Sequence, residues 1–191
     1  MRCSPSAKNA ATSASPAAYP VILYLDTSAL VKVYAEESGR QEVQDAVQEA
    51  RVVAVSEIGY VEARSALARK EREGAFSTDE HDAAVEQLRQ DFRGVYLPRP
   101  VTGEVIARAG ELARKHALRA YDAVHLATAL VLREEAQELA KSSRETEEPA
   151  PQEGEGGDGP RVSMMTFDVS LEKAAGNEGL AHPRQPSCEE R

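Results

Sequence analysis

The 191-residue sequence has no tryptophan, only nine other aromatic residues and two cysteines. A core must therefore be built mainly from Val, Leu, Ile and Ala, which fits the hydrophobic fraction of 41%. No apolar run approaches the roughly 20 residues that cross a bilayer, so we expect a soluble, cytoplasmic protein without a membrane partner. Cys3 and Cys188 stand in the two tails and are interpreted as free thiols; a disulfide between them would join no recognisable element.

The sequence also lacks the motifs of several common enzyme classes. It contains neither a GxxxxGKT phosphate-binding loop nor the GxSxG pattern of serine hydrolases. The four histidines, His81, His116, His125 and His182, do not have the spacing of metal ligands. His125 lies in an apolar stretch three residues after Asp122, and we interpret it as a hydrogen-bonded histidine of the core or of a site's lining.

The net charge of −9 is distributed unevenly along the chain. Glu134 to Pro160 contains nine acidic residues against Lys141 and Arg144, a net charge of −7, which leaves −2 for the rest. If four carboxylates of that remainder were neutralised by metal, its charge would be about +2, which suits a phosphate-bearing substrate. The overall charge therefore does not exclude nucleic acid as a partner.

Short apolar runs alternate with longer amphipathic segments. Strands are expected at Val21–Leu25, Val52–Val55, Val95–Leu97 and Arg161–Phe167. Helices are expected from near Ala29, over Glu42–Ala50, Glu57–Glu73, Ser77–Phe92, Thr102–His116 and Ala120–Leu139, and over Leu171–Ala175. This alternation predicts an α/β domain with a central parallel sheet, in which ligands bind beyond the carboxyl ends of the strands.

Composition divides the chain into one folded domain and three polar segments. Residues 1–20 are rich in Ala, Ser and Pro and are predicted to form a disordered leader. The domain is predicted to span 21–180, interrupted by a disordered acidic insertion at 142–160 that is dense in Glu, Gly and Pro. Residues 181–191 form a polar tail.

Four acidic residues stand where their surroundings do not require an acid. Asp26 and Asp168 each follow a predicted strand, Asp122 begins the most apolar helix, and Glu62 lies beside the apolar stripe of the helix after the second strand. Taken singly, each has a structural explanation, as a helix cap, a residue that favours the helix dipole, or a solvated edge position. Together they could meet at one edge of a parallel sheet.

Carboxylates that meet in this way repel one another and raise their pKa values unless a cation balances them. Hard oxygen ligands suit Mg²⁺ or Mn²⁺ rather than Zn²⁺. The chemistry that follows is attack on a phosphodiester by metal-activated water, with Asp26, Glu62, Asp122 and Asp168 as both metal ligands and catalytic residues.

The same residues carry a resemblance to a known family. The stretches concerned are Leu25-Asp26-Thr27-Ser28-Ala29-Leu30, Ser56 to Leu67, Arg119-Ala120-Tyr121-Asp122-Ala123-Val124-His125-Leu126-Ala127 and Thr166-Phe167-Asp168. In order and spacing, from about Val21 to Leu180, they resemble the PIN-domain family, and in particular the VapC-type toxins of bacterial toxin–antitoxin pairs. The long acidic segment before the last strand and the leader before the first are departures from that pattern.

The resemblance implies a three-layer α/β/α domain and a Mg²⁺- or Mn²⁺-dependent endoribonuclease. It puts the four acids at the family's acidic positions, and Ser28 and Thr166 at hydroxyl positions that support the site. It also implies a homodimer, an RNA substrate and a small cognate antitoxin that inhibits the toxin.

Two other functions remain open at this point. A haloacid-dehalogenase-like phosphatase would need a second acid two residues after the first, where this chain has Ser28. A PIN fold that only binds a protein or RNA would not need all four acids. For RNA contact the candidates are Arg119, Arg64 and Arg69, with solvated side chains or surface ion pairs as the alternative.

Overall fold

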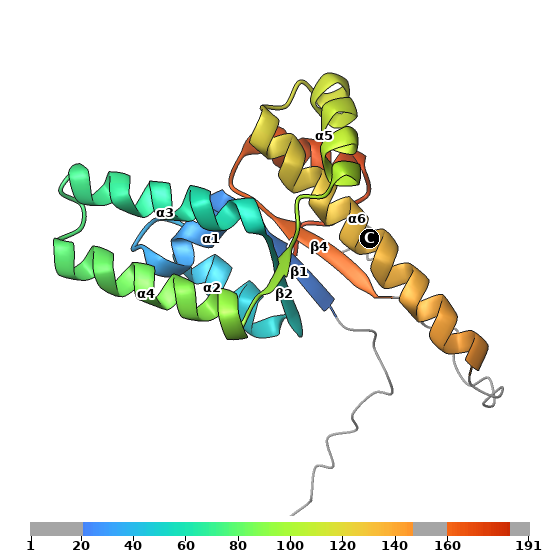
Figure 1. Ribbon diagram of the computed structural model, residues 1–191, viewed down its shortest axis with the longest axis horizontal. Helices are drawn as coiled ribbons and strands as arrows, with labels where there is room; N and C mark the ends of the chain where they lie inside the picture. Colours follow the sequence, from blue (N-terminus) through green and yellow to red (C-terminus); the bar gives the residue numbers. More distant parts are fainter. Residues whose placement is uncertain (1–20, 147–159, 184–191) are drawn as a thin grey trace, which may run out of the picture.

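A computed structural model of the protein describes residues 21–146 and 160–183 and has a four-stranded sheet at its centre (Figure 1). The strands are β1 Val21–Leu25, β2 Val52–Ser56, β3 Leu97–Arg99 and β4 Arg161–Met165. They are hydrogen-bonded in the order β3-β2-β1-β4, and all three pairs are parallel. The carboxyl ends of the strands therefore share one edge, and the predicted α/β class with a central parallel sheet is confirmed.

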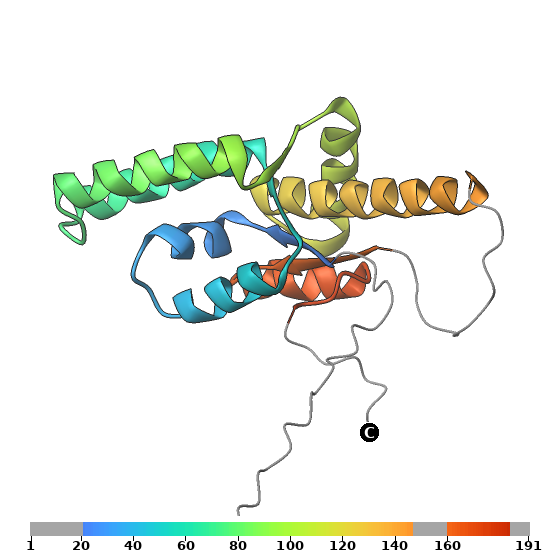
Figure 2. The same cartoon turned by 90° about the horizontal axis from the view of Figure 1, so that it is seen from below.

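Helices cover both faces of this sheet. Within the described ranges they are α1 Thr27–Tyr34, α2 Arg40–Glu49, α3 Glu57–Arg72, α4 Thr78–Gly94, α5 Gly103–His116, α6 Ala120–Thr146 and α7 Val169–Asn177. Figures 1 and 2 both show the α3–α4 pair extending from one side of the sheet and the long α6 extending from the other. The molecule therefore has the three layers predicted for it.

Strand β1 lies between two hydrophobic cores because its side chains alternate between the two faces. Ile22 and Tyr24 pack with apolar residues of α5, α6 and α7. Leu23 and Leu25 pack with those of α1, α2, α3 and α4. Burial on both faces explains why this strand is a continuous apolar run rather than an alternating one.

Local signals define where several helices begin. Asp26 caps α1 by accepting a hydrogen bond from the backbone N–H of Ala29. Ser77 and Glu80 form the predicted capping box at the start of α4. Thr102 caps α5 by accepting from the N–H of Val105. The predicted starts of α4 and α5 are confirmed, whereas α1 begins at Thr27, two residues before the predicted start near Ala29.

The third strand was predicted two residues too early. Val95 and Tyr96 donate their N–H groups to the carbonyl of Asp91, so both residues complete the end of α4 instead. Strand β3 then pairs through Leu97, Pro98 and Arg99. A proline is tolerated there because β3 is an edge strand and can lack one ladder donor.

Helix α6 is longer than its apolar pattern indicated. It continues past Leu139 to Thr146, so the predicted insertion at 142–160 begins within a helix. Residues such as Ala, Gln, Glu and Lys favour a helix even where no apolar face is buried. Strand β4 ends at Met165, two residues earlier than predicted.

Several predicted segments lie outside the described residues: the leader 1–20, most of the insertion, most of the tail, and both cysteines. Ala181, at the start of the predicted tail, forms a parallel bridge with Ser163. No helix among the residues that the structure describes is long and apolar enough to cross a membrane.

Candidate active site

Asp26 is a buried carboxylate at the carboxyl end of the central strand. Its side chain is only 4% exposed. Oδ1 accepts hydrogen bonds from Ser28 Oγ at 2.8 Å and from the N–H of Ala29 at 2.9 Å, and Oδ2 accepts from Thr166 Oγ1 at 2.7 Å. Burial raises the pKa of Asp26, although these hydrogen bonds act in the opposite direction.

The hydroxyls of Ser28 and Thr166 join the ends of β1 and β4. Ser28 Oγ accepts from the N–H of Phe167 at 2.8 Å, and Thr166 Oγ1 accepts from the N–H of Asp168 at 3.1 Å. The N–H of Asp26 also donates to the carbonyl of Met165. The two strand ends that carry Asp26 and Asp168 are therefore tied together by backbone and side-chain hydrogen bonds.

Asp168 and Asp122 both lie at helix N-termini near this point. Asp168 caps α7, with Oδ1 accepting from the N–H of Leu171 at 2.9 Å. Asp122 is in the first turn of α6. Burial, followed by the negative charges of Asp168 and Asp26, raises the pKa of Asp122, while Arg119 and His125 partly oppose the rise. The negative charges of Asp26, Asp122 and Asp168 therefore interact, and Arg119 and His125 compensate them only in part.

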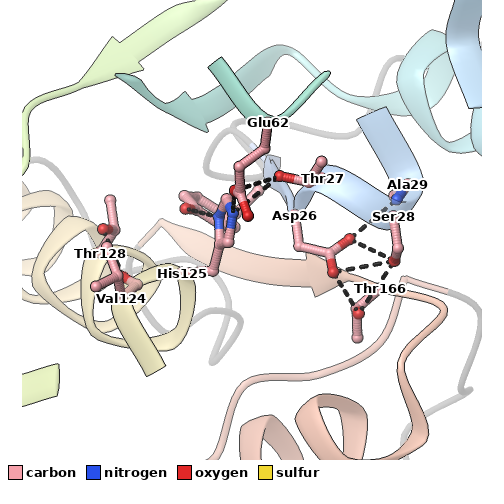
Figure 3. Close-up of polar contacts among 10 residues, drawn as sticks. Asp26, Thr27, Ser28, Ala29, Glu62, Val124, His125, Thr128 and Thr166 are labelled. Atoms are coloured by element: carbon pink, nitrogen blue, oxygen red, sulfur yellow. Dashed lines mark hydrogen bonds and ion pairs between the residues drawn. The ribbon is translucent and has the colours of Figure 1, made fainter. Parts of the chain in front are cut away.

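Glu62 belongs to a second group of hydrogen bonds, which lies beside the group around Asp26 (Figure 3). Its Oε2 accepts from Thr27 Oγ1 at 2.7 Å and lies 2.8 Å from Nε2 of His125. The other ring nitrogen of His125 lies 2.9 Å from the hydroxyl of Tyr24. Burial raises the pKa of Glu62, but the hydrogen bonds from His125 and Thr27 outweigh it, so that the pKa is lowered overall.

The acidic residues fit a hard divalent cation by their chemistry. The carboxylate of Asp122 accepts no hydrogen bond from any described residue, and Oε1 of Glu62 and Oδ2 of Asp168 are likewise available. Unused carboxylate oxygens are the ligands that Mg²⁺ and Mn²⁺ prefer. In the part of the chain that the structure describes, however, no three or more His, Cys, Asp or Glu side chains already form a group that could hold a metal ion.

The three predicted RNA-contacting arginines lie in different surroundings. Arg119 is exposed and acts electrostatically on Asp122. Arg64 is exposed too, but it lies over the ring of Tyr60 and donates to its hydroxyl. Arg69 is exposed on the same face of α3 as Glu62, two turns further on. Only Arg119 is linked to the acids by a described interaction.

Sequence reasoning did not identify Thr27 or Tyr24 as site residues. Both flank Asp26 closely in sequence, but Tyr24 is part of an apolar strand and Thr27 begins a helix, so each has an ordinary structural explanation. The predicted environment of His125 is confirmed, since its ring is buried and hydrogen-bonded on both nitrogens.

An α/β/α domain with acids at the carboxyl edge of a parallel sheet defines a recognisable class. Residues 23–140 match the PIN domain, and the chain belongs to the PIN-domain family.

Two curated relatives come from Mycobacterium tuberculosis: Ribonuclease VapC45 (strain CDC 1551 / Oshkosh) and Ribonuclease VapC49 (strain ATCC 25618 / H37Rv). Each is 37% identical over 111 residues, which covers 58% of this chain and 76% of the relative. Among solved structures, a toxin–antitoxin complex from Klebsiella pneumoniae has a TM-score of 0.53 at 17% identity. That likeness covers 86% of this chain and 99% of the other, and it shows the shared fold.

Proposed function

We propose that this protein is a divalent-metal-dependent endoribonuclease and the toxin of a type II toxin–antitoxin pair. The observation that carries the proposal is that Asp26 and Asp168 stand at the joined ends of β1 and β4, with Asp122 of α6 close to both. Burial, and then the negative charges of Asp168 and Asp26, raise the pKa of Asp122. Membership of the PIN-domain family and the two relatives named as VapC ribonucleases support it.

Asp26, Glu62, Asp122 and Asp168 would hold Mg²⁺ or Mn²⁺ through their oxygens. When bound, such a cation supplies an activated water and stabilises charge on the phosphodiester. Both carboxylate oxygens of Asp26 accept hydrogen bonds, from Ser28, Thr166 and the N–H of Ala29. These residues would keep the carboxylate oriented before substrate arrives.

Arg119 would contact phosphate beside the acids. Its exposed guanidinium already interacts with Asp122, and it would add positive charge where the carboxylates leave an excess of negative charge. Arg69 would make a more distant phosphate contact along α3, and Arg64 would first have to leave Tyr60. We also propose a homodimer in the cytoplasm and a small antitoxin protein as its inhibitor.

The experiment is RNA cleavage by the purified protein in EDTA, in Mg²⁺ and in Mn²⁺. Cleavage should need the metal, and Asp26→Asn and Asp122→Asn should each lower the rate by at least about 100-fold while the far-UV circular dichroism stays unchanged. Glu57→Gln is the matched control, since this exposed acid lies on the same helix as Glu62 but in its first turn. Full activity in EDTA, or in either Asn variant, would contradict the proposal.

A further inference from the structure

Glu62 differs from the other three acids in how it must be positioned. Asp26 and Asp168 are helix caps and Asp122 is in the first turn of α6, so the backbone places their short side chains. Glu62 is the sixth residue of α3, and its longer side chain has more rotamers to choose from. A carboxylate of this kind needs other side chains to hold it in one place.

Two donors converge on one oxygen of Glu62. Thr27 Oγ1 and His125 Nε2 lie 2.7 Å and 2.8 Å from Oε2, and the two donors are 3.1 Å from each other. No described residue hydrogen-bonds to Oε1. The carboxylate is therefore anchored through one oxygen, which leaves the other available as a ligand atom.

The hydrogen bonds around His125 fit a ring with a proton on Nε2. Thr27 uses its only hydrogen for Glu62, so Nε2 must be the donor toward the same carboxylate. At the other side, Nδ1 lies 2.9 Å from the hydroxyl of Tyr24. In the neutral ring that donates through Nε2, Nδ1 is an acceptor, and the Tyr24 hydroxyl is then the donor to it.

Packing also confines the imidazole. His125 is 2% exposed, and its ring meets Tyr24 edge-on with centroids 6.0 Å apart. At Gly59, three residues before Glu62, an added Cβ would stand 3.5 Å from Cε1 of His125, which is ordinary contact distance. The ring is therefore held between β1 and α3, next to the carboxylate that it contacts (Figure 3).

We infer that His125 is a positioning residue for Glu62: together with Thr27 it holds Oε2, and Tyr24 holds the imidazole from its Nδ1 side. The inference rests on the proposed function, because its purpose is to present Oε1 of Glu62 to the divalent cation. Partners that orient metal ligands in this way commonly change metal affinity by about 10- to 100-fold when removed.

The test compares His125→Phe, His125→Gln and Tyr24→Phe in the full chain. Two quantities are measured: the Mg²⁺ concentration for half-maximal RNA cleavage, and the rise in melting temperature on adding Mn²⁺ without RNA. His125→Phe should raise the half-maximal Mg²⁺ concentration about 10-fold or more, and it should reduce the Mn²⁺-induced rise. His125→Gln retains an N–H donor and should restore both quantities in part toward the wild-type values. Tyr24→Phe keeps the imidazole and should change both quantities less than His125→Phe does.

Tyr96→Phe is the control, since it removes another buried hydroxyl in the opposite core without touching the site. It should leave both metal responses unchanged. If His125→Phe fails to fold, Tyr24→Phe decides the question alone. Wild-type metal responses in the folded His125 and Tyr24 variants would overturn the positioning role but not the proposed function. No metal effect on the wild-type protein would overturn both.

Discussion

At the scale of single residues, the four acids differ most in how many hydrogen bonds their carboxylates already accept. Both oxygens of Asp26 accept hydrogen bonds, whereas Asp122 accepts none from the described residues. A half-buried carboxylate without donors, such as that of Asp122, destabilises the folded chain until a cation or a proton neutralises it. Removing the charge at each position should therefore have different effects on the metal-free protein.

Asp122→Asn should raise the melting temperature of the metal-free protein at pH 7. In the folded chain the pKa of Asp122 is raised above its ordinary value of 3.8 by burial, Asp168 and Asp26. At pH values between the ordinary pKa and the raised pKa, the folded chain holds a proton that the unfolded chain has released. The free energy of unfolding therefore falls as the pH rises through this range. The asparagine side chain carries no charge, so the variant does not lose this stability as the pH rises. Its gain in melting temperature over the wild type should shrink as the pH is lowered toward 3.8.

Differential scanning calorimetry in EDTA across this pH range measures the effect. Asp26→Asn is the informative comparison, because an amide cannot accept all the hydrogen bonds that Asp26 receives, and it should show no such gain. A lower melting temperature for Asp122→Asn at pH 7 would show that the negative charge is compensated.

Thr166→Val should cost about 1–2 kcal/mol of unfolding free energy. The change keeps the side-chain shape but leaves Asp26 without one donor and the N–H of Asp168 without its acceptor. Thr166→Ser retains the hydroxyl and serves as the control. Urea denaturation without metal gives both values, and equal stability of the two variants would mean that this hydroxyl does not hold the strand ends together.

At the scale of elements, α1 and α4 are joined by a buried chain of hydroxyls. Tyr34, the last residue of α1, donates to Oδ2 of Asp91 on α4 at 2.8 Å. Its oxygen lies 2.8 Å from the hydroxyl of Tyr96, which must then be the donor. Burial, Tyr96 and Asp91 together raise the pKa of Tyr34 strongly, so its hydroxyl stays protonated. This contact fixes the helix that carries Ser28 against the outer helix pair.

Tyr34→Phe should therefore lower the free energy of unfolding by about 1–2 kcal/mol, since Asp91 is buried and would lose a donor. Tyr60→Phe is the matched control, because among the described residues the Tyr60 hydroxyl hydrogen-bonds only to the exposed Arg64, and its loss should stay within about 0.5 kcal/mol. Equal effects of the two variants in urea denaturation would indicate that the Tyr34–Asp91 contact adds nothing.

At the scale of the whole molecule, the acidic residues near the end of α6 and in the segment after it fall into two groups. On α6, Glu134 forms a two-fold ion pair with Arg108 of α5, and Glu138 pairs with Lys141. Residues 147–159 carry five further acids and no base, and they lie outside the described residues. The first group stabilises contacts within the domain or along α6, so the second is the one to test for an effect on RNA.

Replacing residues 147–159 with a Gly/Ser sequence of equal length should leave stability nearly unchanged and speed RNA cleavage at low salt. Keeping the length keeps the entropy of loop closure. Removing five negative charges lessens repulsion of a polyanion, and screening should erase the gain when salt is high. Initial rates at two salt concentrations test this; a large loss of stability would show that the segment packs on the domain.

The sequence by itself determined the order of strands and helices along the chain, and it placed Asp26 and Asp168 just beyond the ends of two strands. Buried strands, capping boxes and N-cap hydroxyls are local signals, readable from a few neighbouring residues. The same reasoning misplaced β3 and ended α6 too early, because an edge strand containing Pro98 and a polar helix end carry weak patterns.

Only the tertiary structure decided which side chains meet. It brought Asp26, Asp122 and Asp168 close enough for their negative charges to interact, since β1, β4 and the first turn of α6 come together at the sheet's edge. It turned Glu62 toward His125 and Thr27, residues 63 and 35 positions away in sequence. Such contacts depend on how α3 and α6 pack around β1. A pattern of neighbouring residues does not show which residues far apart in the sequence will meet.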